Sequence, residues 1–222
     1  MKRIAILAVA AMTTFGIACN TDRRDAANSG AVGTAGNTDV SRGDRDFVND
    51  VAIANMAEIE LGKLAAGRAV NAEVKRFAQM MVDDHTAAAG KLKTVATTHK
   101  IAVPTEIDDK HRDLRERLSK LQGAEFDREY MKAMVDGHED VVDKLESRID
   151  KERLAEYKAK YPTPGGRKTD EEIKVDAVMP ENSDDRVTMA VNQFAADAYP
   201  IVFAHLQKAK ALDETVKKNT TN

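Results

Sequence analysis

From about residue 44 onward, apolar side chains recur at alternating steps of three and four residues. This spacing puts them along one side of an α-helix, where they can pack against other helices. The longest unbroken example runs from Val74 to His99. Ala, Lys, Glu, Asp and Met are frequent and aromatic residues make up only 5%, which favours helix over strand. The pattern predicts long helices over about 44–67, 72–99, 126–149 and 185–216, with a short charged helix over 107–121.

The breaks between these segments predict how the helices connect. The link at Asn71, a helix-capping residue type, is short, so the first two helices should be antiparallel neighbours. Pro104 interrupts the chain before the short helix, and this longer crossing lets the second and third long helices run parallel. Pro200 should kink the last helix or start a new segment. We expect an all-α, ferritin-like four-helix bundle with one extra crossover helix.

The stretch over about 152–185 does not fit a bundle helix. Residues 161–166 read Tyr-Pro-Thr-Pro-Gly-Gly, which suits neither helix nor strand, and residues 180–185 read as a second loop. We interpret 152–185 as a loop inserted before the last helix of a bundle domain that spans 44–217.

The N-terminus has the pattern of an export signal. Lys2 and Arg3 precede an apolar run over 4–18, which has the length of a signal-peptide core but is short for a membrane span. Gly16-Ile17-Ala18-Cys19 resembles a lipobox, in which the cysteine thiol receives a lipid and becomes the mature N-terminus. Ordinary secretion with cleavage after Ala18 and an uncleaved anchor are the alternatives.

Residues 19–43 then form a lipidated cysteine followed by a tether. The tether is rich in Gly, Ala, Asn, Asp, Thr and Ser and has no apolar periodicity. We expect a protein of the cell envelope that faces the periplasm and is held to a membrane through a lipid on Cys19.

Composition and charge exclude several functions. The net charge is −3 and no basic stripe is present, which argues against nucleic acid as a partner. Cys19 is the one cysteine, so no disulfide can form within the chain. No serine lies in a nucleophile-elbow motif and no glycine-rich phosphate loop precedes a helix. No catalytic residues are predicted.

Each long helix carries one residue of metal-ligand type on its apolar side. Imidazoles and a carboxylate that converge inside a bundle are what a transition-metal site needs, and thioethers beside imidazoles suit copper, particularly Cu(I). The structural alternative is that the methionines fill core gaps and the histidines are neutral, hydrogen-bonded core residues. The candidate metal ligands are Glu58, His85, His138 and His205, with Met81 and Met134 one helical turn before two of the histidines.

Two observations speak against particular metal sites. Di-iron proteins of the ferritin type use Glu-x-x-His pairs, but Val82, Val135 and Val202 stand three residues before the three histidines. Counted from the first turn, Glu58 and His85 differ in height by roughly 7–8 Å, so both could not easily bind one ion.

A weak internal repeat relates the second and third long helices. Met81-Val-Asp-Asp-His85 matches Met134-Val-Asp-Gly-His138 at a constant offset of 53 residues. Chance agreement between two amphipathic helices remains the alternative explanation.

Several stretches together resemble a known family. The segments Val74–Thr86 and Phe126–His138, with Phe47-Val48, Glu58–Ala65 and Pro200–Leu206, are similar to a bacterial domain of unknown function numbered 4142, placed in the ferritin-like clan. The resemblance covers about 44–212 and implies a helix bundle in an exported or membrane-associated protein. This chain departs from the family at Gly137, where Asp is usual, and in its longer link before the last helix.

These observations lead to three functional hypotheses. The first is a non-enzymatic, exported helix bundle of the cell envelope that acts as a binding or stress-related module. The second is a periplasmic metal-binding protein, with copper ahead of iron, that uses His85, His138 and His205. The third is a ferritin-type oxidoreductase, which the missing Glu-x-x-His pairs speak against.

Overall fold

The computed structural model describes residues 40–161 and 177–219. These residues form six α-helices, and within them the only β-type pairing is an isolated bridge between Ile149 and Pro180. The predicted signal peptide, Cys19, most of the tether and the centre of the insertion lie outside the described residues. The helices are α1 (Arg42–Arg68), α2 (Ala72–Thr98), α3 (Asp109–Ser119), α4 (Gly123–Glu146), α5 (Lys151–Lys160) and α6 (Arg186–Asn219).

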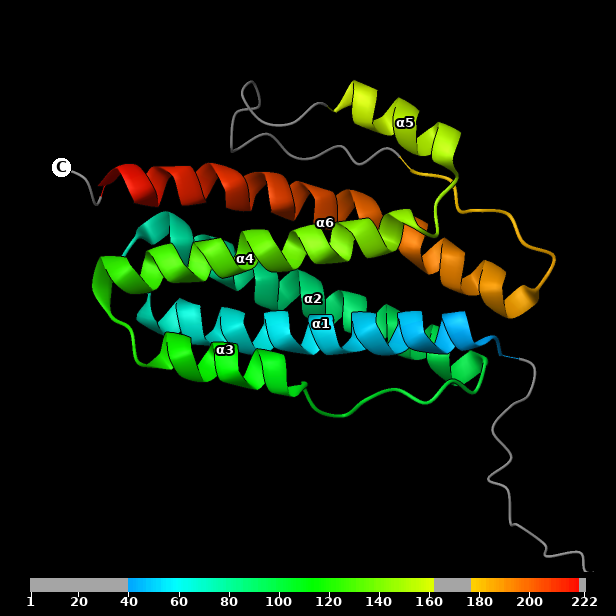
Figure 1. The fold of residues 1–222 in the computed structure, drawn as a ribbon, viewed down its shortest axis with the longest axis horizontal. Coiled ribbons are helices and arrows are strands. Elements are labelled where there is room, and N and C mark those ends of the chain that lie inside the picture. Colours follow the sequence, from blue (N-terminus) through cyan, green and yellow to red (C-terminus); the bar gives the residue numbers. More distant parts are fainter. Residues whose placement is uncertain (1–39, 162–176, 220–222) are drawn as a thin grey trace, which may run out of the picture. The chain divides into compact units, whose positions relative to one another are not determined.

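The four long helices α1, α2, α4 and α6 form the predicted all-α bundle (Figure 1). Helix α1 packs mainly on α2, and α4 packs mainly on α6. No helix in the described ranges combines the length and the apolar character that crossing a membrane requires.

The α1–α2 hairpin is held by caps at its turn. The side chain of Asn71 accepts hydrogen bonds from the backbone N–H groups of Glu73 and Val74, which confirms the predicted cap. The backbone N–H groups of Val70 and Asn71 donate to the buried carboxylate of Asp127 on α4, at 3.1 and 2.7 Å. This carboxylate fixes the turn against the start of α4.

Gly62 brings α1 and α2 close together. A Cβ atom at this position would lie 2.9 Å from Cγ2 of Val82 and 3.0 Å from the carbonyl oxygen of Ala78. Both distances are shorter than ordinary van der Waals contact, so the two backbones approach as closely as they do because Gly62 has no side chain.

The crossover connects the far end of α2 to the start of α4. Asp108 caps α3, which lies beside α1, and Arg115 of α3 forms an ion pair with Glu60 of α1. Helix α3 ends at Ser119, earlier than predicted. Gly123 is the first residue of α4 with a φ of 61°, a conformation that glycine adopts at little cost.

The region before the last helix differs from the prediction. We expected 152–185 to be a loop, but it begins with α5, whose N-cap Asp150 accepts a hydrogen bond from the backbone N–H of Arg153. Tyr157 of α5 is buried and its ring contacts that of Tyr199 at a centroid distance of 5.6 Å. Although most residues of α5 are charged, its buried Tyr157 therefore packs the helix against α6.

Helix α6 continues through Pro200 rather than ending there. Figure 1 shows its first half, in orange, and its second half, in red, running in different directions. A change of direction within one helix is what a proline that cannot donate a backbone hydrogen bond produces.

The buried apolar side chains form two clusters, one toward each end of the bundle. On α2, Met81 belongs to one cluster and Leu92 to the other; on α4, Met134 and Val142 are divided in the same way. Between the members of each pair the one buried residue is a histidine, His85 on α2 and His138 on α4. The bundle therefore has a buried polar layer where its two apolar clusters meet.

Candidate metal centre

Three histidines from three helices meet in this polar layer. His85 of α2, His138 of α4 and His205 of α6 are each at most 5% exposed. Their ring centroids lie 5.6, 5.5 and 5.6 Å apart, so the rings form a nearly equilateral triangle. One nitrogen from each ring lies within 4.8 Å of the others. The structure thus brings together the three predicted histidines.

Hydrogen bonds hold the outward-facing nitrogens of two rings. Nδ1 of His138 lies 2.8 Å from the backbone carbonyl oxygen of Met134. Nε2 of His205 lies 2.9 Å from a carboxylate oxygen of Asp84, which reaches across from α2. A carbonyl and a carboxylate oxygen accept hydrogen bonds, so these nitrogens donate, and in the neutral form of each ring the other nitrogen has a free lone pair.

The third ring is held from α1. Nδ1 of His85 lies 2.8 Å from the side-chain oxygen of Asn55, a buried residue. With the amide oriented so that its oxygen faces the ring, Nδ1 is again the donor and Nε2 has the lone pair.

The inward-facing nitrogens have no hydrogen-bond partner among the described residues. These atoms are Nε2 of His85, Nε2 of His138 and Nδ1 of His205. A buried polar atom without a partner costs roughly 1–3 kcal/mol, and three lone pairs directed at one another add repulsion. A cation between the three nitrogens would remove both costs, since each lone pair would then coordinate it.

Burial keeps two of the imidazoles neutral. Desolvation, followed by the neighbouring His138 and His205, lowers the pKa of His85 well below its ordinary value. Desolvation and His205 lower the pKa of His138 to about 3, although its bond to Met134 acts in the opposite direction. Near neutral pH both rings are unprotonated, which is the state that binds a metal.

Glu58 lies beside the triangle and is not one of its corners. Its carboxylate is 3.6 Å from Nδ1 of His138, and its second oxygen has no hydrogen-bond partner among the described residues. Burial raises the pKa of Glu58 to about 8. Near pH 7 this contact therefore joins two neutral groups and is not an ion pair.

The predicted methionines belong to the apolar cluster next to the histidines. Met81 and Met134 are fully buried and pack with Phe77 and Tyr130. The structure places them one helical turn from His85 and His138. Their role as ligands stays a prediction.

Heights counted from the α1–α2 turn show which residue of α1 lies level with His85, a partner that the sequence analysis did not name. Asn55 and His85 are equally far from the turn at Val70, and they form the hydrogen bond across the α1–α2 interface. Glu58, three residues closer to the turn, lies against His138 instead. Counted from Val70, Glu58 and His85 differ in height by three residues, about 4–5 Å rather than the 7–8 Å expected above, and only this shifted count identifies Asn55. Asp84 could not be found by such a count, because its contact with His205 depends on how α6 is placed against α2.

The internal repeat coincides with the arrangement of buried residues. Residues of α2 and α4 that are 53 positions apart are buried in equivalent places on both helices. These pairs are Phe77 and Tyr130, Met81 and Met134, His85 and His138, and Leu92 and Leu145.

The remaining two histidines lie away from the triangle. His111 pairs with Asp108, its neighbour at the start of α3. His99, where the apolar pattern of this helix ends, is the C-cap residue of α2. Neither belongs to the group of potential metal ligands.

Comparison with known proteins gives a family but no activity. A family model described as Domain of unknown function (DUF4142) matches residues 29–160. No curated protein and no solved structure matches the chain. The matched range contains Glu58, His85 and His138, whereas His205 lies beyond it.

Proposed function

The chain belongs to the DUF4142 family, and from its histidine triangle we propose that it is a non-enzymatic protein that binds one divalent transition-metal ion. One observation carries the proposal: each of the three buried imidazoles keeps one nitrogen without a hydrogen-bond partner while its other nitrogen is held by a hydrogen bond, and one nitrogen of each ring lies within 4.8 Å of the others. Such outer bonds fix the ring orientation of metal-binding histidines and make them better ligands.

The spacing of the nitrogens suits one ion after small adjustments. Around a tetrahedral ion with bonds of about 2.0 Å, ligand nitrogens are about 3.3 Å apart. The three nitrogens lie within 4.8 Å of one another, so modest side-chain rotations close the remaining distance. Three protein ligands leave one position for a water molecule or another small ligand.

The ligand type narrows the choice of metal. Imidazole binds copper, zinc, nickel and iron, and affinity for such sites rises along the series to Cu²⁺. The ligating group contains no carboxylate and no thiolate. We therefore place Cu²⁺ and Zn²⁺ ahead of Fe²⁺.

The same proposal includes the location that the N-terminal sequence predicts. A signal peptide over 1–18, a lipid on Cys19 and a tether would hold the bundle at a membrane of the cell envelope, facing the periplasm. If so, Cys19→Ser releases the protein from the membrane fraction of the producing cells. A Cys19→Ser variant that stays in that fraction contradicts the lipid anchor.

Metal binding is tested with the full chain carrying Cys19→Ser, which removes the one thiol. We expect one Cu²⁺ or Zn²⁺ per chain by elemental analysis, and about 4 kcal/mol of added stability at a free-metal concentration of 1,000 times Kd. Substituting His85 and His138 by Ala should weaken binding more than about 100-fold, since even the outer partners of such ligands contribute 10–100-fold.

The chain offers a matched control for this test. His99 and His111 are the two histidines outside the triangle. The His99→Ala, His111→Ala double variant should bind the metal as the parent does. Equal loss in both double variants, or unchanged stability on adding metal, contradicts the proposal.

A further inference from the structure

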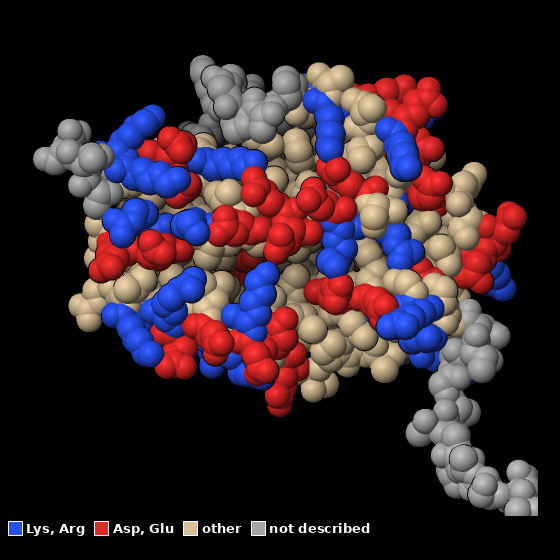
Figure 2. Space-filling model, in the orientation of Figure 1, with Lys and Arg blue, Asp and Glu red and all other residues tan. Residues whose placement is uncertain are grey.

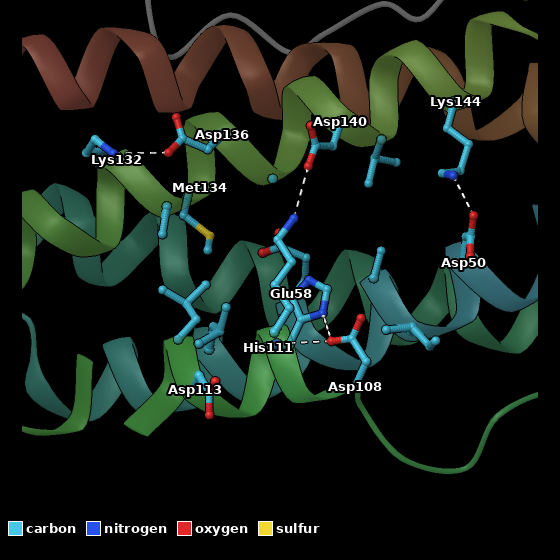
Figure 3. A pocket seen from close by; sticks show the side chains of 18 of the residues that line it. Asp50, Glu58, Asp108, His111, Asp113, Lys132, Met134, Asp136, Asp140 and Lys144 are labelled. Carbon is cyan, nitrogen blue, oxygen red and sulfur yellow. Dashed lines mark hydrogen bonds and ion pairs between the residues drawn. The ribbon is translucent and has the colours of Figure 1, made fainter. Parts of the chain in front are cut away.

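A cavity of about 740 Å³ lies between α1, α3 and α4, on the side of the bundle away from α6. Glu58 lines it, together with Met134 and Gly137 of α4. Figure 3 shows Glu58 in the middle of this pocket, with Asp140 and Asp136 on α4 and with His111 and Asp108 at α3.

The rim of the pocket is acidic. Its lining contains eight carboxylate residues against four lysines and arginines. Figure 2 shows acidic side chains gathered in a row across the middle of this face. Some are paired, as Asp136 is with Lys132 and Asp140 with Lys110, but exposed pairs of this kind are weak and leave the excess of negative charge in place. An acidic cleft raises the local concentration of cations.

The floor of the pocket adds an independent feature. Glu58 is 6% exposed, one of its oxygens has no hydrogen-bond partner among the described residues, and the residue is accessible from the pocket. Its other oxygen is 3.6 Å from the His138 ring. Glu58 therefore contacts the pocket on one side and a corner of the histidine triangle on the other.

Gly137 makes room for this carboxylate. A Cβ atom at Gly137 would lie 3.3 Å from Oε1 of Glu58, which is closer than ordinary packing allows. The glycine leaves the Glu58 side chain space to move between the pocket and His138.

From this geometry we propose that the pocket is the route by which the metal ion reaches the histidines, with Glu58 as a transit ligand at its floor. The ion enters past the acidic rim, binds Glu58 as the carboxyl group releases its proton to the water in the pocket, and passes to the nitrogens of the triangle. This inference rests on the proposed metal-binding function. The competing route is on the opposite side, where the partly exposed Asp84 contacts His205.

A transit ligand has a kinetic signature that differs from that of a permanent ligand. It speeds entry and exit equally, so its loss lowers both rate constants and leaves Kd nearly unchanged. Loss of a permanent ligand raises the dissociation rate constant and weakens Kd.

The experiment measures the rates of Co²⁺ binding and release by stopped-flow absorbance in the full chain carrying Cys19→Ser. Glu58→Gln and Glu58→Leu should each bind one Co²⁺, with association and dissociation both slowed at least about tenfold. Using two variants covers the case in which Glu58→Leu does not fold. Asp136→Asn together with Asp140→Asn should slow association and make it less sensitive to salt. Asp197→Asn, an exposed acid on α6, is the matched control and should leave the rates unchanged.

The outcomes separate this inference from the proposed function. If the parent protein binds no Co²⁺, Cu²⁺ or Zn²⁺, the proposed function fails and the route fails with it. If the parent binds metal and the Glu58 variants load at the parental rate, only the route is wrong. Faster release from the Glu58 variants, or slowing only in Asp84→Asn, also overturns the transit role.

Discussion

Two of the buried polar regions in the described part of the bundle differ in how their polar groups are paired. At one end, Asp44 of α1 is fully buried and accepts hydrogen bonds from Ser41 at 2.6 Å, Thr188 at 2.7 Å and Arg148 at 2.6 Å. Burial alone would raise the pKa of Asp44, but these three partners lower it below its usual value. In the middle of the bundle, the histidine triangle has three inward nitrogens without such partners.

Arg148 is satisfied as fully as Asp44. Its guanidinium also donates to the backbone carbonyl of Gly43 at 2.7 Å and lies 4.9 Å from the ring centroid of Phe47. This network joins α1, the segment after α4, and α6, and no polar group in it calls for a further ligand. The comparison teaches that a buried polar group with all its partners serves the fold, whereas buried lone pairs without partners indicate a binding site.

The largest effect should come from breaking the satisfied network. Asp44→Ala leaves the Arg148 guanidinium without its buried partner and should lower the unfolding free energy by about 3–5 kcal/mol. Urea denaturation without metal measures this. Asp46→Ala, which removes an exposed partner of Arg42, should cost less than about 0.5 kcal/mol. Metal affinity should be unchanged in both, and a large loss of affinity in Asp44→Ala would mean that the two regions are coupled.

The next effect is a pH dependence of the unfolding free energy that arises from Glu58, beside the histidine triangle. Folding raises the pKa of Glu58 from 4.5 to about 8, so its contribution to stability is fully present below pH 4.5 and is lost as the pH rises to about 8. Glu58→Gln lacks this loss. Between pH 4.5 and 8 the unfolding free energy of Glu58→Gln should therefore increase relative to the parent by on the order of a few kcal/mol.

His85 and His138 act in the opposite direction below about pH 6.5. Because their pKa values are lowered in the folded state, they cost no stability above pH 6.5, and the cost grows as the pH falls toward about 3. The parent and Glu58→Gln both contain these histidines, so this loss of stability at low pH cancels in the difference between their unfolding free energies. A parallel pH profile for Glu58→Gln and the parent would show that Glu58 is already ionised in the folded protein.

A smaller effect is expected from the outer partner of one ligand. Asp84→Asn weakens the acceptor that orients His205, and the Kd for Cu²⁺ should rise 10–100-fold. Competition with a chelator of known affinity measures the change. Asp83→Asn is the matched control, since Asp83 is exposed and bonds Gln79 on the same helix. Equal affinity in the two variants would show that Asp84 is only a surface acid.

The smallest effect, and the one of unexpected sign, concerns the metal-free protein. His138→Leu replaces a buried nitrogen that has no partner with an apolar group of similar size, so apo stability should stay equal or rise by about 1–2 kcal/mol. Thermal unfolding in the presence of a chelator tests this. A loss above about 2 kcal/mol would mean that His138 serves the fold, as Asp44 does, and the distinction between the two regions would fall.

Much of the fold could be predicted because each long helix carries a sustained apolar stripe. The period of α2 over 27 residues and the capping side chain of Asn71 depend only on local sequence. Helix α5 was missed because its run of charges conceals two buried residues, Leu154 and Tyr157, whose partners are far away in the chain. The third long helix was expected from residue 126 but α4 begins at Gly123, since a glycine with positive φ is more usual after a helix than at its first residue.

The candidate site was predictable in its ligands and less so in its geometry. His85, His138 and His205 each lie on an apolar stripe, so burial in one core follows from the fold. Whether they meet at one height depends on the position of α6 along the bundle axis. The sequence does not give this position, because the long link before α6 prevents counting residues from a tight turn. The height count set Glu58 apart from His85, and in the structure the Glu58 carboxylate lies against His138.

The absent side chain at Gly62 has a consequence for which ions the site accepts. Asn55 and His85 lie about two turns further along the same close interface between α1 and α2, so the separation of these helices sets where the His85 ring stands. An alanine at position 62 would force the helices apart and withdraw Asn55 from that ring. If the triangle binds a metal as proposed, the separation of these two backbones sets which ionic radius fits, and a residue that touches no ion can then alter selectivity among metals.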